Sequence, residues 1–171
     1  MTIRPATPAE FDAIAELCVA AYAPFVAGDH RYVQTLRDVA TRAGAADLLV
    51  AADGADVLGT VTFVPDGGPL GEIAGPDEGE FRMLAVDPAA RGRGVGAALT
   101  RYVVDASRAR GKAAVVCSTM PGIRAAHALY RRLGFERVPR RDWSAKAGQH
   151  SRPATRCYFD TSSVVVIVGA L

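Results

Sequence analysis

The stretch that decides the fold is Glu80-Phe81-Arg82-Met83-Leu84-Ala85-Val86-Asp87-Pro88-Ala89-Ala90-Arg91-Gly92-Arg93-Gly94-Val95-Gly96. Its first part, Glu80–Val86, is mainly apolar and is halted by Asp87-Pro88, which predicts a strand. Alternating glycines follow, and then an apolar stripe at helical spacing that predicts a helix ending near Arg110. A strand, a glycine loop and a helix therefore succeed one another along the chain.

The glycine loop at Arg91–Gly96 has the chemistry of a phosphate site. Glycine permits unusual dihedrals and close approach, so several amides can point toward one spot. The following helix adds free N–H groups and the positive end of its dipole, and this combination binds phosphate. Arg91 and Arg93 add charge suited to a doubly anionic group. We predict that the loop binds a pyrophosphate.

Two other interpretations of the loop compete with this one. Gly92-x-Gly94-x-x-Ala97 also fits the dinucleotide fingerprint, which is weak when it stands alone. Against that fold, Asp87–Arg91 separates the strand from the glycines, the next strand ends Cys117-Ser118-Thr119 without an acid, and no second set of βαβ units follows. The remaining alternative is a flexible glycine turn that binds no ligand.

The residues before this stretch predict two helices and an antiparallel hairpin. Thr2–Arg4 is a short strand candidate, and Thr7-Pro8-Ala9-Glu10 predicts a capped helix that runs to about Ala23. A weaker helix is expected at about Arg31–Thr41. The expected hairpin strands are Asp47–Ala52 and Val57–Val64, with Asp-Gly in the turn between them.

The residues after the central helix predict a βαβ unit and further strands. The expected elements are a buried strand at Ala113–Ser118, a helix at Ile123–Leu133, and strand candidates at Phe135–Arg140, Arg156–Phe159 and Val164–Val168. Together with the front half, they predict one α/β domain. Its sheet is mixed and carries helices on both faces, in place of a repeating βαβα sheet.

Two motifs resemble those of a known family. Glu80–Pro88 followed by Arg91-x-x-Gly94-x-Gly96 resembles the central motif of the GNAT acetyltransferases, and Ala125–Phe135 resembles that family's later Tyr-x-x-x-Gly-Phe element. The opening Ile3–Thr7 resembles its first strand and turn. The resemblance covers about residues 2–140. It implies a GNAT-like acyl-CoA N-acyltransferase fold, a single mostly antiparallel sheet with a central splayed parallel strand pair.

The resemblance also implies acetyl-CoA as the acetyl donor. The strand at Met83–Val86 is expected to diverge from Ala113–Ser118, and the pantetheine arm is expected to bond to backbone groups in that gap as an extra strand would. The acceptor amine is expected to attack the thioester directly, without an acyl-enzyme. The residues expected to bind the cofactor are Met83, Leu84, Ala85, Val86, Arg91, Gly92, Arg93, Gly94, Val95, Gly96 and Ala97.

This reaction needs a base, because an alkyl amine with a pKa of about 10 is almost entirely protonated at pH 7. By resemblance the candidate base is Glu80, acting through water, with its pKa raised by the like charge of Glu78 or Asp77. The alternative is that Glu80 is an exposed carboxylate at the strand edge that only attracts a cationic substrate.

Tyr130 matches the family tyrosine that protonates the sulfur of coenzyme A, and its phenol can donate to a thiolate. Tyr130 also lies on an apolar helical stripe, so the alternative is a core residue. His127 is better explained as a structural histidine, and Cys117 as a buried thiol without a charged neighbour in sequence. His30 and His150 have no ligand spacing, so we expect no metal.

Length, charge and cysteine content bound the class of protein. A chain of 171 residues predicts one domain spanning 1–171. A net charge of +2 favours neither nucleic acid nor membrane as a partner, and three scattered cysteines do not make a disulfide framework. The N-terminus has no signal-peptide segment. We therefore expect a cytoplasmic protein.

The acceptor is expected to be a primary amine of a small molecule or peptide. The stretch Pro65–Glu80 contains Asp66, Glu72, Asp77, Glu78 and Glu80 and no basic residue, which favours a cationic acceptor. A second function class is an acyl-CoA-binding sensor or regulatory module without catalysis, and a third is an interaction protein with a vestigial cofactor site. Having both Glu80 and Tyr130 favours the enzyme.

The chain departs from the family pattern in two places. Thr119–Arg124 contains no asparagine where many family members carry one, so one contact to the cofactor is unassigned. The part at 141–171 is longer and less strand-like than expected, and within it Trp143 covers either the acceptor cleft or the core. Val164–Leu171 is a last strand, a homodimer contact or a disordered apolar tail.

Overall fold

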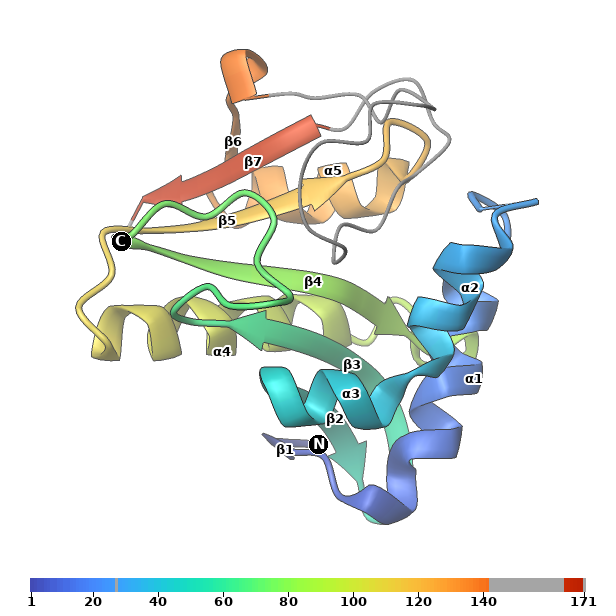
Figure 1. The fold of residues 1–171 in the computed structure, drawn as a ribbon. Helices are drawn as coiled ribbons and strands as arrows, with labels where there is room; N and C mark the ends of the chain where they lie inside the picture. Colours follow the sequence, from blue (N-terminus) through green and yellow to red (C-terminus); the bar gives the residue numbers. More distant parts are fainter. Residues whose placement is uncertain (27, 142–164, 171) are drawn as a thin grey trace.

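One seven-stranded sheet organises the chain, and Figure 1 shows its helices on both faces. The computed structural model describes residues 1–26, 28–141 and 165–170. The strands are β1 (Thr2–Pro5), β2 (Asp47–Asp53), β3 (Asp56–Val64), β4 (Glu78–Val86), β5 (Ala114–Thr119), β6 (Glu136–Arg137) and β7 (Val165–Ala170). The helices are α1 (Phe11–Tyr22), α2 (His30–Arg37), α3 (Val39–Ala45), α4 (Val95–Ala109) and α5 (Arg124–Arg132), with 3₁₀ turns at Pro8–Glu10, Pro88–Ala90 and Pro139–Arg141.

The strands lie in the order β1-β2-β3-β4-β5-β7-β6. Among the described strands, β4 and β5 form the parallel pair and every other neighbouring pair is antiparallel. The predicted class, a single mixed and mostly antiparallel sheet with a central parallel pair and helices on both faces, is therefore confirmed.

The sheet separates two apolar cores, because side chains along a strand alternate between its faces. Leu49 and Ala51 of β2 pack in the core that contains Val95, Leu99 and Val103 of α4. The alternate residues of β2 pack in the other core, with Ile14 and Cys18 of α1 and Leu36 of α2. Each helix layer thus buries its own face of the sheet.

The first helix begins as predicted, while the second is divided. Thr7 N–H donates to Glu10 Oε2 at 2.7 Å, as a capping box requires. The helix expected at Arg31–Thr41 is instead α2 and α3, because the chain leaves helical dihedrals at Asp38. The carboxylate of Asp38 then caps α3 by accepting from Thr41 N–H at 3.2 Å.

The β4 and β5 strands diverge in the middle of the sheet. Their pairing runs from Glu78 opposite Ala114 to Glu80 opposite Val116 and goes no further. The resemblance predicted this splay, and the strand pairing confirms it. Past Glu80, the backbone N–H and C=O groups of β4 that face β5 are not paired with that strand and can bond to a ligand.

A β-bulge lies in the open half of β4. Thr60 and Thr62 of β3 pair with Ala85 and Arg82, so β4 has one residue more than β3 over this stretch. Met83 there adopts φ +52°, a left-handed conformation that is uncommon for any residue with a side chain. The bulge redirects the backbone of β4 next to the gap between the strands.

The C-terminal strand lies between β5 and β6. The strand expected at Val164–Val168 is β7, which pairs with β5 from Thr119 opposite Val165 to Ala114 opposite Ala170. The strand expected at Phe135–Arg140 is only Glu136–Arg137, because a 3₁₀ turn starts at Pro139. Trp143 and the strand expected at Arg156–Phe159 fall outside the described residues.

Candidate active site

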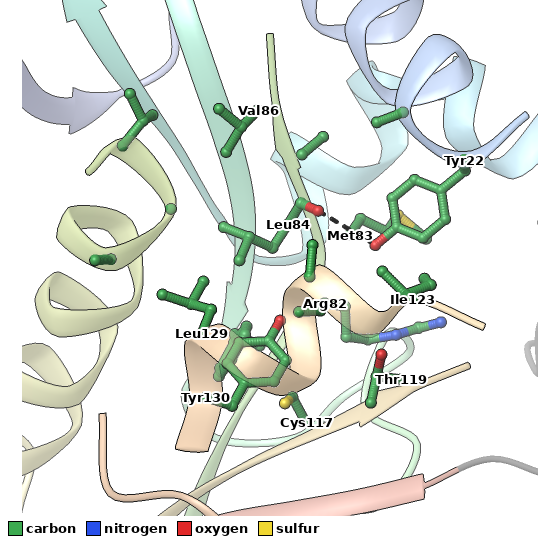
Figure 2. A pocket seen from close by; sticks show the side chains of 18 of the residues that line it. Tyr22, Arg82, Met83, Leu84, Val86, Cys117, Thr119, Ile123, Leu129 and Tyr130 are labelled. Atoms are coloured by element: carbon green, nitrogen blue, oxygen red, sulfur yellow. Dashed lines mark hydrogen bonds between the residues drawn. The ribbon is translucent and has the colours of Figure 1, made fainter. Parts of the chain in front are cut away.

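A pocket of about 510 Å³ opens where β4 and β5 diverge (Figure 2). Its walls come from the open half of β4, the end of β5, the start of α4, and parts of α1 and α5. Residues distant in sequence therefore meet at the break in the sheet. The expected cofactor residues that line it are Met83, Leu84, Ala85, Val86, Arg91, Gly92, Gly94, Val95, Gly96 and Ala97.

The glycine loop presents its amides to this pocket. Gly92 and Gly94 have φ of +77° and +80°, which side chains disfavour. Ala98 is the first residue of α4 whose N–H bonds back into the turn, to Gly94 O at 2.9 Å. The preceding amides at Val95–Ala97 have no acceptor within the helix, so they remain available to an anion in the pocket.

Gly96 allows the start of α4 to pack closely against Leu129 and Val86. A Cβ on Gly96 would lie 3.2 Å from Leu129 Cδ2 and 3.5 Å from Val86 Cγ2. The free amides at Val95–Ala97 and the lining side chain of Arg91 together suit a pyrophosphate at the helix start. The site fits coenzyme A on this evidence.

Arg93 does not lie where it was expected. It is absent from the pocket lining among the described residues, and its guanidinium reaches Asp53 at 3.4 Å instead. Asp53 ends β2 beside the hairpin turn, so the hairpin orients this side chain away from the pocket. Of the two arginines in the loop, Arg91 is the one placed to contact a bound phosphate.

The backbone of β4 borders the pocket from Phe81 to Val86. Tyr22 of α1 donates its hydroxyl to the carbonyl of Leu84 at 3.4 Å across the pocket wall, as Figure 2 shows. Burial raises the pKa of Tyr22 well above its ordinary value, so the phenol stays a donor. The open strand edge supplies the peptide groups that an extended amide-containing ligand pairs with.

Tyr130 lies in the pocket wall and is 4% exposed. Its ring packs edge-on against Phe81, with centroids 5.6 Å apart, and beside Phe135 at 5.7 Å. Burial, then the nearby Cys117 thiol, raises the pKa of Tyr130 well above its usual value. Tyr130 is therefore a core residue that also lines the pocket, and its role as the acid stays a prediction.

Cys117 lies beside Tyr130 and lines the same pocket (Figure 2). Burial raises the pKa of its thiol strongly, while its hydrogen bond with Tyr130 acts in the opposite direction. A thiol of raised pKa holds little thiolate at neutral pH and is a poor nucleophile. The geometry agrees with a structural thiol.

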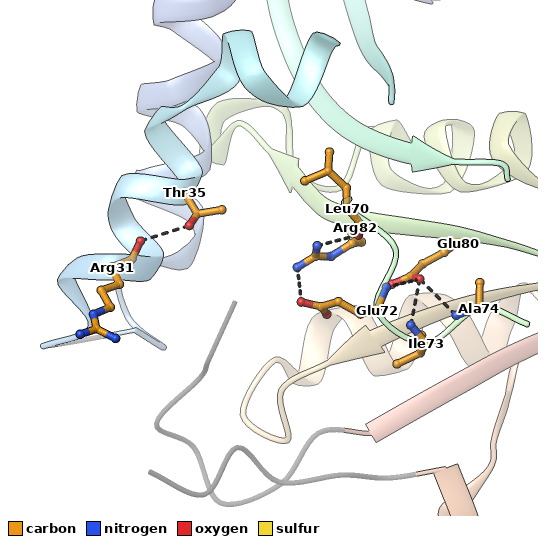
Figure 3. Close-up of polar contacts among 8 residues, drawn as sticks. All are labelled: Arg31, Thr35, Leu70, Glu72, Ile73, Ala74, Glu80 and Arg82. Carbon is orange, nitrogen blue, oxygen red and sulfur yellow. Dashed lines mark hydrogen bonds and ion pairs between the residues drawn. The ribbon is translucent and has the colours of Figure 1, made fainter. Parts of the chain in front are cut away.

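Glu80 is fully buried and does not line the pocket among the described residues. Its Oε2 accepts the amides of Glu72, Ile73 and Ala74 at 2.9, 3.1 and 3.2 Å, as Figure 3 shows. Its Oε1 is buried and has no hydrogen-bond partner among the described residues. The alternative of an exposed carboxylate that attracts a cation is wrong, because Glu80 is inaccessible to solvent.

Alternate residues of β4 hold the loop that precedes it. Besides Glu80, Arg82 donates to Leu70 O at 2.8 Å and to Glu72 Oε1 at 2.6 Å. Glu78 accepts from the amide of Gly75 at 2.8 Å. The loop at residues 70–75 is thus fixed against β4 by its own backbone (Figure 3).

The acidic stretch before β4 is largely neutralised within the chain. Glu72 pairs with Arg82, and Glu78 pairs with Arg141 at 2.7 Å. The hydrogen bond with the Arg141 guanidinium lowers the pKa of Glu78, so Glu78 is an ionised member of an ion pair. This stretch consequently gives no support for a cationic acceptor.

The charges that do reach the pocket are positive. Among the described residues its lining includes Arg82, Arg91 and Arg132 and contains no aspartate or glutamate. Arg82 and Thr119 lie at the end near Tyr22, away from the glycine loop (Figure 2). Sequence reasoning assigned a role to neither residue: Arg82 lies within the Glu80–Pro88 motif but was not expected to bind a ligand, and Thr119 belongs to no local motif.

Histidines take no part in the pocket lining within the described ranges. The Nε2 atom of His127 lies 3.1 Å from Met120 O, which agrees with a structural histidine. The described residues contain no group of three or more His, Cys, Asp or Glu side chains that could hold a metal. In the same residues no helix is long and apolar enough to cross a bilayer.

Comparison with known proteins gives a family match over most of the chain. The model of the acetyltransferase (GNAT) family matches residues 12–135. A relative from Danio rerio, N-acetylaspartate synthetase, is 36% identical over 80 residues, covering 47% of this chain and 28% of that protein. The match spans only a minor part of that relative.

Solved structures share the whole fold. A ribosomal-protein-alanine N-acetyltransferase from Brucella melitensis is 22% identical with a TM-score of 0.67, and 100% of each chain is covered. An acetyltransferase from Bacillus subtilis in complex with CoA is 15% identical with a TM-score of 0.67, covering 99% of this chain and 97% of that one. At these identities the likeness shows the fold.

Proposed function

This chain belongs to the GNAT family of acetyltransferases, and from that premise we propose that it transfers an acetyl group from acetyl-CoA to a primary amine of a small molecule or peptide. One observation carries the proposal. The start of α4, whose first amides have no acceptor within the helix, lines the same pocket that the open edge of β4 borders. The helix start can hold an anion, and the open edge of β4 can pair with an extended chain that contains amides.

The residues that would hold acetyl-CoA divide between these two features. Gly92, Gly94 and the amides at Val95–Ala97 would hold the diphosphate, with Arg91 adding charge. The backbone at Met83–Val86 would pair with the pantetheine amides. When bound, acetyl-CoA supplies an acetyl group activated as a thioester.

Tyr130 supplies the proton that a departing thiolate needs. Its Oη is buried in the wall of the pocket, and its raised pKa keeps the proton in place until an anion develops beside it. Placement of a hydroxyl where negative charge appears is the usual means by which a protein stabilises such a transition state. Tyr130 is therefore the proposed acid.

The base is less directly placed than the acid. Glu80 is held by three backbone amides beneath the loop at residues 70–75 and does not line the pocket. We infer that Glu80 acts chiefly by positioning that loop. The acceptor amine would then lose its proton to water in the pocket. Glu80 would act as the base only if that water passed the proton on to its unpaired Oε1 atom.

The nature of the acceptor has support from one relative. The name N-acetylaspartate synthetase describes an amino acid acetylated on nitrogen, and this relative shares 80 aligned residues with the chain. A small amine is therefore favoured over a protein acceptor. The aligned part is 28% of that protein, so aspartate itself is not carried over.

A second candidate function is an acyl-CoA-binding sensor without catalysis. The observation that favours it is the absence of a carboxylate or histidine from the described pocket lining. Tyr130 favours the enzyme, because a sensor has no use for a proton donor at the thioester end.

A thiol-release assay with acetyl-CoA and a panel of amines separates the two. We expect steady release of free coenzyme A with at least one amine, and formation of the N-acetyl product by mass spectrometry. Tight binding of acetyl-CoA without product from any amine would support the sensor. Failure to bind coenzyme A at micromolar concentration would exclude both.

A further inference from the structure

The end of the pocket opposite the glycine loop has its own polar groups. Arg82 of β4 and Thr119 of β5 line it, together with the apolar side chains of Phe25, Met120 and Ile123. The two polar residues come from the two strands that diverge, so they flank the break in the sheet (Figure 2). This is the part of the pocket left for the acceptor once the cofactor occupies the β4 edge.

Thr119 has an unused hydroxyl at this end. The residue is 7% exposed, and its Oγ1 is buried with no hydrogen-bond partner among the described residues. Leaving a buried hydroxyl without a hydrogen-bond partner destabilises the unliganded protein. A ligand that accepts a hydrogen bond at Thr119 would remove that cost.

Arg82 contributes the charge. Its side chain is 5% exposed and is ion-paired at 2.6 Å with Glu72, whose side chain is 3% exposed. Arg82 lines the pocket and Glu72 does not. The pair is therefore oriented with its cationic side toward the pocket and its acidic side toward the loop at residues 70–75, and it is fixed before any ligand arrives.

We propose that the acceptor is an amine that also carries a carboxylate, such as a free amino acid, and that Arg82 and Thr119 bind this carboxylate. The inference rests on the proposed function and names the substrate class of the same site. A buried carboxylate needs a cation and hydrogen-bond donors. This end supplies the guanidinium of Arg82, whose charge is shared with Glu72, and the unpaired hydroxyl of Thr119. A cationic acceptor such as a polyamine would meet arginine and no described carboxylate in the lining.

Matched acceptors test the proposal. Leucine, leucinamide and isopentylamine share a side chain, but only leucine has the carboxylate. The amine of leucinamide is less basic, so a larger fraction is neutral, and without recognition it would react faster. We expect kcat/KM for leucine to exceed that of either analogue by about tenfold or more, as expected for hydrogen bonds to a charged group.

Variants locate the effect. Thr119→Val should lower kcat/KM for leucine severalfold more than for isopentylamine, which has no acceptor at this position, and Thr119→Ser should restore the preference. Ser107→Ala is the matched control, since Ser107 also has a buried hydroxyl without a partner among the described residues and does not line the pocket. Arg82→Lys should lower kcat/KM for leucine more than for leucinamide. Because this change disturbs the buried ion pair with Glu72, the variant can fail to fold, and the Thr119 variants then decide the question.

A binding measurement keeps the test independent of turnover. Leucine titrated calorimetrically into protein saturated with desulfo-coenzyme A should bind more tightly than leucinamide, and Thr119→Val should remove the difference. Equal use of all three acceptors, or a preference for spermidine, would overturn the carboxylate site and leave the acetyltransferase intact. Absence of coenzyme A binding would instead overturn the proposed function.

Discussion

Glu80 and Val116 are the last residues at which β4 and β5 stay paired, and the pocket begins directly beyond them. The backbone of Glu80 closes the parallel ladder, while its side chain fixes the loop at residues 70–75. One residue thus ends the continuous sheet and supports the loop beside the opening.

Gly94 should matter for cofactor binding beyond its effect on stability. Gly94→Ala places a Cβ at φ +80°, which costs about 1 kcal/mol of folding stability and turns the amides of the helix start. Gly54→Ala is the matched control, since Gly54 has φ +62° in the β2–β3 turn. Both should lower the melting temperature, but only Gly94→Ala should weaken coenzyme A binding, by about tenfold or more. Equal affinities of Gly94→Ala and Gly54→Ala for coenzyme A in calorimetry would contradict a phosphate site at the glycine loop.

Tyr130→Phe should lower kcat by about 10²-fold or more, in the range lost with a general acid, without changing the affinity for coenzyme A. Tyr102→Phe, on the exposed side of α4, is the control and should keep full activity. Because burial raises the pKa of Tyr130, the hydroxyl stays protonated above pH 10, so activity should show no loss from this group up to that pH. Thiol-release assays measure the loss of kcat, and a pH–rate profile measures the alkaline limit of activity. Full turnover by Tyr130→Phe would exclude Tyr130 as the acid.

Glu80→Gln tests whether the residue positions a loop or removes a proton. The amide of Gln can still accept the three backbone N–H groups but places an NH₂ at the buried Oε1 site. Positioning predicts a lower melting temperature, a raised KM for the acceptor, and an unchanged pH profile of kcat. A base predicts that kcat falls by about 10²-fold or more and that the acidic limb of the profile disappears.

The capping box should make stability depend on acid in a defined window. A hydrogen bond from Arg4, followed by those from Thr7, lowers the pKa of Glu10 to about 2. A lowered folded-state pKa stabilises the protein above the unfolded value of 4.5, and this stabilisation is lost as pH falls through about 2. Glu10→Gln should therefore be less stable than the parent at pH 7, and the difference should vanish below about pH 2. Urea unfolding at several pH values measures this difference. Glu16→Gln is the control: Glu16 forms an exposed ion pair with Arg37, so the free energy of unfolding of this variant should stay near that of the parent at every pH.

The parts that sequence could predict depend on local patterns. The capping box at Thr7, the Asp-Gly hairpin and the glycine loop each lie within a few residues, and their geometry follows from the dihedrals and hydrogen bonds of those residues. The stretch Glu80–Gly96 could therefore locate one wall of the pocket without coordinates. The division at Asp38 was missed because its side chain competes with helical continuation by capping the next helix.

The parts that sequence could not predict depend on distant contacts. The position of the Arg93 side chain depends on its ion pair with Asp53, next to the β2–β3 turn. Glu80 is enclosed by the loop at residues 70–75, whose carbonyls accept hydrogen bonds from Arg82 and Arg141. The insertion of β7 between β5 and β6 is likewise a long-range pairing. Thr119 enters the pocket only because the strands diverge past Val116, which no motif at Thr119 records.

An amide titration of the ¹⁵N-labelled protein with coenzyme A tests the central claim most directly, because that claim assigns the diphosphate to peptide N–H groups at the start of α4. We predict large, saturable shifts at Gly92, Gly94 and the amides of Val95–Ala97, with Gly54 unmoved. Saturable shifts confined to other parts of the chain, or no shift at millimolar coenzyme A, would contradict the account.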